Sequence, residues 1–121
     1  MSSEISAEQE LLMGLGYCAF ILILSYILMK FPPKKINSLY GYRTRRSMSN
    51  DKLWTVANHF SAKAMVKMSW YSFLVPAIMY LIAPNYNFIT TVIVNTLLIL
   101  SVYLQTESYL NKKFDQDGNP L

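Results

Sequence analysis

The stretch LLMGLGYCAFILILSYILM, residues 11–29, contains no charged side chain over 19 residues. In an α-helix these residues extend about 28 Å, close to the roughly 30 Å thickness of the hydrocarbon core of a bilayer. The residues before it are acidic (Glu4, Glu8 and Glu10), and no small-residue cleavage site follows it. We therefore expect a membrane-spanning helix rather than a cleaved signal peptide.

A second uncharged region, residues 68–106, is interrupted by the segment Ala83-Pro84-Asn85-Tyr86-Asn87. Proline lacks a backbone N–H and asparagine tolerates turn geometry, so this segment predicts a tight turn between two further spans. Each half is near the lower length limit of a span, and the first becomes longer if its helix begins within residues 62–67.

Composition agrees with a membrane protein, since 53% of the 121 residues are hydrophobic and 15% are charged, against about 25% charged in soluble domains. The sequence predicts an all-α integral membrane protein with three transmembrane helices in one domain, residues 11–110. We expect an acidic tail at residues 1–10 and a polar tail at residues 111–121. A soluble helical bundle is the alternative.

Lysine and arginine are concentrated between the first two predicted spans. Residues 30–67 hold nine of the 11 basic residues and one acid, a net charge of +8, whereas the whole chain carries +4. Basic residues in short loops mark the cytoplasmic side. The pattern predicts that loop 30–67 and the C-terminal tail are cytoplasmic, and that the N-terminus and the Pro84 turn lie outside.

A helix is predicted to begin within this loop, because Ser49-Asn50-Asp51 supplies a capping oxygen and an acid for the first turn. An apolar stripe follows at helical spacing, with Trp54 beside it: Leu53, Ala57, Phe60, Ala64 and Met68. Such an amphipathic helix suits the headgroup layer, either lying along it or running into the second span. Its stripe could also pack on the other helices.

The loop also contains three arginines, at positions 43, 45 and 46. They could serve only as a topology signal, and a basic cluster also attracts anionic lipid. Their hydroxyl, amide and glycine neighbours favour an ordered anion-binding site over a topology signal alone. Guanidinium forks bind phosphate or carboxylate with two parallel hydrogen bonds. We expect a site for an acidic headgroup, a peptide carboxylate or a partner's acid, formed by Asn37, Tyr40, Gly41, Tyr42, Arg43, Thr44, Arg45, Arg46, Ser47, Asn50 and Trp54.

The letters Asn37, Tyr40-Gly41-Tyr42-Arg43-Thr44, Ser47-Met48, Asn50 and Trp54 resemble the signature loop of the SdpI family of bacterial membrane proteins. In that family the loop joins the first two helices of a three-helix unit. The family's namesake is a longer immunity protein that protects a producing cell from its own secreted membrane-active toxin, and it holds a transcriptional repressor at the membrane. The resemblance implies a bacterial inner-membrane location and a role in toxin immunity or envelope protection. An accessory subunit of a larger membrane complex is the alternative.

No sequence pattern of an enzyme is present: we find no carboxylate pair, nucleophile elbow or glycine-rich phosphate loop. His59 is the single histidine and has no other ligand at metal-binding spacing. We therefore expect no catalytic residue, cofactor or metal. Nucleic acid is not an expected partner, because the basic loop would lie against the bilayer.

Within the predicted spans, Asn95 is expected to form an interhelical hydrogen bond, because an amide in lipid needs a partner. Pro76 predicts a kink and a freed carbonyl. Gly14 and Gly16 would permit close helix approach, and Cys18 is expected to be a packing residue. Glu107, at the inner end of the third helix, is the expected ion-pair partner of Arg43, Arg45 or Arg46.

Overall fold

The computed structural model describes residues 5–121 and is built from helices: α1 (Ala7–Lys30), α2 (Asp51–Ser72), α3 (Leu74–Ile82), the 3-10 turn η1 (Pro84–Tyr86) and α4 (Asn87–Lys113). Three helical segments are long and apolar enough to cross a membrane: Ala7–Lys30, Asp51–Ile82 and Pro84–Lys113. The prediction of an all-α protein with three membrane spans is therefore confirmed.

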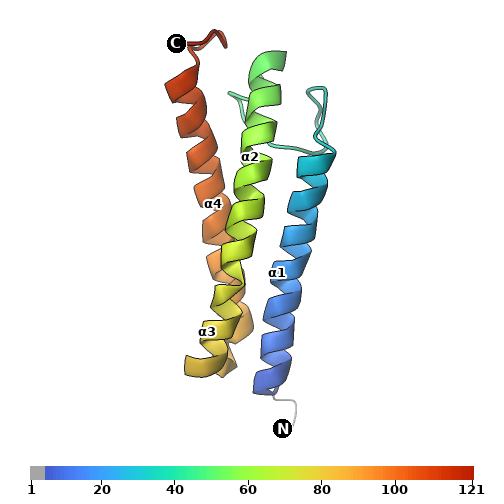
Figure 1. Cartoon of the computed structure of the whole chain (residues 1–121), viewed down its shortest axis with the longest axis vertical. Coiled ribbons are helices and arrows are strands. Elements are labelled where there is room, and N and C mark those ends of the chain that lie inside the picture. Colours follow the sequence, from blue (N-terminus) through green and yellow to red (C-terminus); the bar gives the residue numbers. More distant parts are fainter. Residues whose placement is uncertain (1–4) are drawn as a thin grey trace.

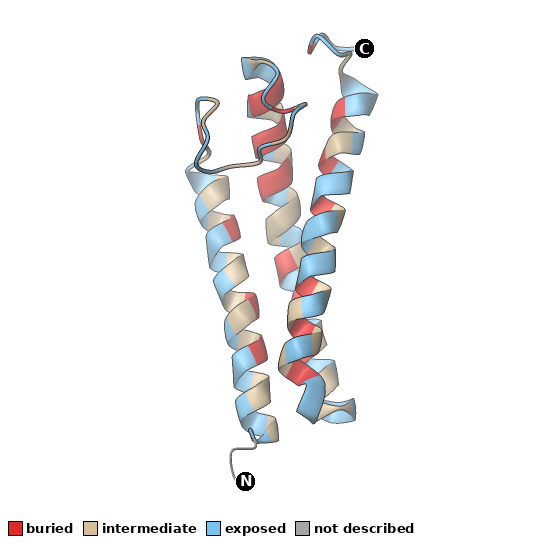
Figure 2. Ribbon diagram, turned by 180° about the vertical axis from the view of Figure 1, so that it is seen from behind, coloured by how far each residue is buried: buried red, intermediate tan, exposed pale blue. Residues whose placement is uncertain are grey.

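The three spans run side by side and alternate in direction (Figure 1). The first turn of α1 lies at the same end as α3 and η1, whereas residues 31–50 and the C-terminus lie at the opposite end, hereafter the loop end. Helix α2 packs against both α1 and α4. Buried residues face the interior of the bundle and are dense on α2 near the loop end (Figure 2).

Helix α1 begins earlier than the first uncharged stretch, at Ala7. Ser6 accepts a hydrogen bond from the Gln9 N–H while the Gln9 side chain accepts from the Ser6 N–H, a reciprocal capping box. Glu8 and Glu10 thus belong to the first helical turn, where negative charge is favourable, rather than to a tail. Glu4 lies outside the described residues.

The helix predicted from Asn50 is the first part of the second span, since α2 continues without interruption to Ser72. Leu53 and Ala57 of the apolar stripe are fully buried. Trp54 is also fully buried rather than placed in the headgroup layer, and the polar residues Asn58 and Ser61 are buried too. The physical reason is that this part of α2 packs between two helices and beneath the loop.

The second span is interrupted at Phe73, between α2 and α3, and Pro76 follows in the first turn of α3. A proline cannot donate to the carbonyl four residues earlier. The freed Ser72 carbonyl accepts instead from the Cys18 thiol of α1, at 3.6 Å. The Pro76 carbonyl accepts from Asn87 Nδ2 of α4, at 2.9 Å, so side chains of the two other spans stabilise the break.

Small and polar side chains fill the interior of the bundle, as expected where lipid provides no hydrophobic drive for helix association. Asn95 donates to its own helix at Thr91 O, at 2.9 Å, and to Cys18 Sγ of α1, at 3.7 Å. A Cβ atom on Gly14 would lie 3.0 Å from Pro76 Cβ, whereas one on Gly16 would have nothing within 4 Å. Close helix approach therefore depends on Gly14 and not on Gly16.

Candidate functional site

The loop at residues 31–50 has a shape fixed by its own polar side chains. Its first turn is formed by Asn37, whose Oδ1 accepts from the N–H groups of Leu39 and Tyr40, at 2.8 and 2.9 Å. The Asn37 Nδ2 group donates to Lys35 O, at 2.9 Å. Asparagine is favoured in such a turn because its side chain replaces a backbone partner.

Gly41 lies where the loop meets α2, with a φ of 107°. A Cβ atom there would approach Pro33 Cγ to 2.6 Å and Asn58 Oδ1 to 2.7 Å. Trp54 Nε1 donates to Pro33 O, at 2.8 Å, and Asn58 Oδ1 accepts from the Tyr42 N–H, at 2.7 Å. The signature glycine is therefore required by a positive φ and by close packing.

Thr44 and Ser47 close the next turn through reciprocal hydrogen bonds. The Thr44 N–H donates to Ser47 Oγ at 2.9 Å, and the Ser47 N–H donates to Thr44 Oγ1 at 3.1 Å. Ser47 is fully buried. Asn50 then caps α2, because its Oδ1 accepts from the Leu53 N–H at 2.9 Å.

Tyr42 and Thr44 connect the loop to α4 by donating to the same carboxylate oxygen. The Tyr42 hydroxyl lies 2.5 Å and the Thr44 hydroxyl 3.0 Å from Glu107 Oε2. Burial, followed by the hydrogen bond and the negative charge of Glu107, raises the pKa of Tyr42 far above its ordinary value. Glu107 thus has two hydroxyl partners in this structure, in place of the guanidinium expected from the sequence.

Arg46 connects the loop to the end of α4. Its Nη2 group donates to the carbonyls of Phe114 and Asp115, both at 3.0 Å, and of Leu110 at 3.4 Å. These are carbonyls of the last turn of α4 and the residues after it, where a cation is favoured. Its Nε atom is buried and has no hydrogen-bond partner within residues 5–121. Arg46 is therefore part of the framework.

The C-terminal segment 114–121 is folded onto the loop, which the sequence did not lead us to expect. Asp115 Oδ1 accepts from the N–H groups of Asn119 and Asp117, and these backbone hydrogen bonds, that of Asn119 first, lower the pKa of Asp115. Gly118 has a φ of 85° and packs against Asn50, whose Nδ2 donates to Asp117 O at 3.0 Å. The signal that could have predicted this turn is the cluster of Asp, Gly and Asn after α4.

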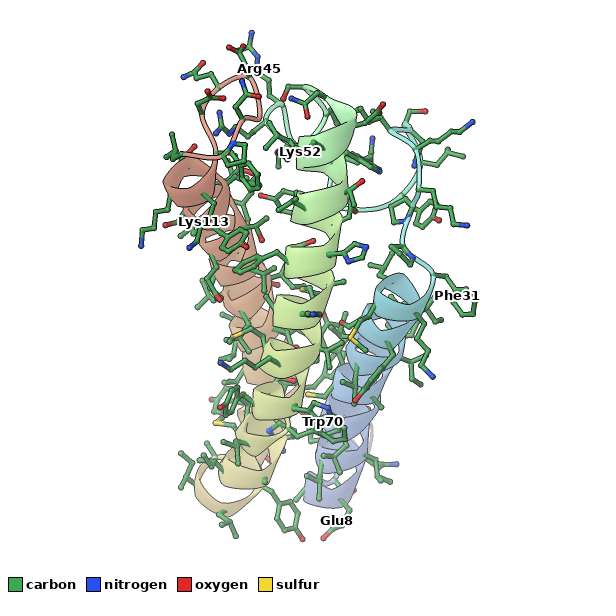
Figure 3. The ribbon with its side chains drawn as sticks, turned by 45° about the horizontal axis from the view of Figure 1, so that its top comes forward. Glu8, Phe31, Arg45, Lys52, Trp70 and Lys113 are labelled. Atoms are coloured by element: carbon green, nitrogen blue, oxygen red, sulfur yellow. The ribbon has the colours of Figure 1, made fainter. Side chains whose placement is uncertain are left out.

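Arg43, Arg45 and Tyr40 remain exposed on this fixed loop. Arg45 lies at the loop end, above the ends of α2 and α4 (Figure 3). It contributes to a polar cavity of about 420 Å³ between the loop and α4, lined also by Thr44, Arg46, Ser49, Glu107 and Asn111. Two guanidinium groups and several hydroxyl or amide groups thus face one solvent-accessible space, an arrangement suited to an anionic ligand.

Residues 34–105, more than half of the chain, match the SdpI/YfhL protein family. The chain belongs to this family. The family match contains the whole signature loop, so the resemblance noted from residues 37–54 is confirmed. Among curated proteins, the "Uncharacterized protein YfhL" of Bacillus subtilis (strain 168) is 60% identical over 47 residues, which are 38% of this chain and 43% of that protein. The match thus covers less than half of that relative, and no solved structure matches the chain.

The signature of this SdpI/YfhL family member is largely explained by loop construction. Its asparagines form the first turn and cap α2, its glycine permits a close approach, and its tryptophan holds Pro33. Pro33 and Asn58, which receive these contacts, were not identified as site residues from the sequence. Of the signature residues, Tyr40, Arg43 and Met48 are exposed and accessible to a ligand.

Proposed function

We propose that the loop of this SdpI/YfhL family protein binds an anionic group at the membrane surface through Arg43 and Arg45. The observation that supports this most directly is the contrast among its three arginines. Arg46 is engaged with backbone carbonyls, whereas the guanidinium groups of Arg43 and Arg45 are exposed on the same fixed segment. A rigid loop loses little conformational entropy on binding, and this favours affinity.

Charge at the loop end supports the same proposal. Exposed Lys34 and Lys35 precede the arginines in the same loop, and each basic residue near an anionic surface contributes about 1 kcal/mol. Guanidinium adds a planar fork that holds phosphate or carboxylate with two parallel hydrogen bonds, which an ammonium group cannot do. The loop would therefore recognise the shape of an anionic group in addition to its charge.

The biological role proposed with this binding is toxin immunity or envelope protection at a bacterial inner membrane. Family membership and the charge distribution support it, with the loop in the cytoplasm. A toxin or another membrane protein would then be a partner beside the anionic lipid. The proposal assigns no catalytic residue, cofactor or nucleic acid.

Two double variants separate the role of the guanidinium forks from the role of net charge. Arg43→Lys with Arg45→Lys keeps both charges and removes the forks, whereas Lys34→Gln with Lys35→Gln removes two charges and keeps the forks. Retention of dioctanoyl phosphatidylglycerol by the purified protein, measured by native mass spectrometry, should fall more in the first variant. Equal retention by the arginine variant and the wild type would overturn the role of the forks.

An accessory subunit of a larger membrane complex is the second candidate. It is favoured by the exposed outer surface of the bundle, because most of the apolar length of each of the three spans is not buried within the chain. Purification in mild detergent distinguishes the two roles. A stoichiometric larger partner supports the accessory role, and toxin sensitivity of a deletion strain without such a partner supports immunity.

A further inference from the structure

A second cavity lies beneath the loop, between the parts of α1, α2 and α4 that are nearest the loop end. Its volume is about 180 Å³. Leu28 of α1, Met65 of α2 and Ile99 of α4 form its walls, and Pro33, Gly41 and Tyr42 of the loop also line it. Two residues of the family signature, Gly41 and Tyr42, therefore line an apolar cleft at the level of the spans.

The lining of this cleft changes from polar to apolar with distance from the loop. Along α2 it passes from Asn58 and Ser61 to Met65, and along α4 from Tyr103 to Ile99. Helix α2 starts at the loop end and α4 finishes there, so the polar residues on both helices are those nearer the loop. The cleft thus has the polarity of a membrane interface above hydrocarbon.

Tyr103 lines both this cleft and the polar cavity of about 420 Å³ described above. The charged residues facing that polar cavity are Arg45, Arg46 and Glu107. Glu107 already accepts hydroxyl hydrogen bonds at Oε2, and the two guanidinium groups exceed its single negative charge. An apolar space and a cationic space are therefore neighbours that share Tyr103 as a lining residue.

We propose that the two cavities together bind one molecule of anionic phospholipid, with its phosphate at Arg45 and part of one acyl chain in the cleft. This inference rests on the proposed anion-binding function and names its ligand class. The size of the cleft favours a chain, because a dry apolar cavity of about 150 Å³ holds benzene. A helix from a partner protein, about 10–12 Å wide, is too large for it.

The first test narrows the cleft without changing any charge. Ala62 lines the cleft and is 5% exposed, and Ala62→Leu would place a larger side chain in it. The matched control is Ala77→Leu, on the exposed surface of α3. Binding of dioctanoyl phosphatidylglycerol to the purified full chain should weaken about tenfold in Ala62→Leu, the factor expected when roughly two methylene groups lose burial. Ala77→Leu should bind like the wild type.

Two headgroup probes separate this inference from the proposed function. Glycerol phosphate has the anionic group without acyl chains, and dioctanoyl phosphatidylcholine has the chains without net charge. Tight binding only of the anionic lipid supports the inference. If glycerol phosphate binds as tightly as the lipid and depends on the arginines, the cleft has no role but anion binding stands. If the binding of every probe is the same with and without Arg43 and Arg45, the proposed function fails.

A photoreactive acyl chain gives a second measurement on the wild-type protein, which avoids any folding defect of Ala62→Leu. Phosphatidylglycerol carrying a diazirine on its chain should label Leu28, Met65 or Ile99. Labelling confined to the outer surface of the spans would show that the acyl chain does not enter the cleft. Loss of labelling when two copies of the chain associate would show that a second copy, and not lipid, occupies the cleft.

Discussion

The Tyr42 hydroxyl donates to the Glu107 carboxylate, joining the loop to α4 across 65 positions of sequence. Thr44 donates to the same oxygen, so one carboxylate fixes both ends of the Tyr42–Thr44 segment. Arg43 lies between these two residues and is exposed. The hydroxyl contacts thus fix the backbone on both sides of an arginine whose side chain is exposed.

Tyr42→Phe should lower the thermal stability of the purified protein, because it removes a hydrogen bond to a charged group. The expected loss is about 1.5–3 kcal/mol, the usual range for such bonds. Thermal unfolding in detergent would measure it. Tyr40→Phe is the matched control on the exposed part of the loop and should have no effect. Equal melting temperatures for Tyr42→Phe and the wild type would show that the contact does not stabilise the fold.

Alkaline pH should destabilise the wild type more than Tyr42→Phe. The folded state raises the pKa of Tyr42 above the value of about 10 in the unfolded chain. The contribution is therefore fully present below pH ~10 and is lost as pH rises further, because the unfolded chain then releases a proton that the folded chain retains. Unfolding curves from pH 8 to 11 should show that the difference in unfolding free energy between the wild type and Tyr42→Phe becomes smaller above pH ~10.

Gly41→Ala should disrupt the loop more than its small size suggests. The position has a φ of 107°, and the added Cβ would lie 2.6 Å from Pro33 Cγ. Strain at such a position costs on the order of 1–3 kcal/mol, and the clash adds to it. Limited proteolysis of the loop should become faster. In Gly16→Ala the added Cβ has nothing within 4 Å, so this variant should be cleaved at the wild-type rate.

The spans could be predicted from sequence because lipid imposes length and apolarity on any helix that crosses it. The tertiary partners could not, since they depend on how distant segments meet. Tryptophan is a residue type typical of the membrane interface, yet Trp54 of α2 is buried under the loop, where it donates a hydrogen bond to Pro33 O. The sequence predicts that Glu107 lies near the arginines. Its hydrogen bonds come instead from the Tyr42 and Thr44 hydroxyls, because these are the loop side chains that face α4.

The charge distribution predicts which end of the bundle faces the cytoplasm. Ser38→Cys in the exposed part of the loop should resist a membrane-impermeant maleimide in intact cells, whereas Asn85→Cys in the turn between α3 and α4 should react. The native Cys18 is buried and should give little background. Labelling of Ser38→Cys from outside would show that the orientation is the opposite one and that the loop does not lie at the cytoplasmic leaflet.

Arg45 and Arg46 are adjacent in sequence but should respond differently to the same substitution. Arg46 Nη2 alone contacts three carbonyls at and just beyond the end of α4. The lysine in Arg46→Lys is shorter by one atom, so its ammonium group would not reach the position of Nη2. We expect this substitution to release residues 114–121, detected as faster carboxypeptidase digestion and a lower melting temperature. Arg45→Lys, on an exposed side chain, should leave both unchanged and reduce only lipid retention. If Arg46→Lys instead reduced lipid retention while digestion and melting stayed at wild-type values, Arg46 would belong to the ligand site and not to the framework.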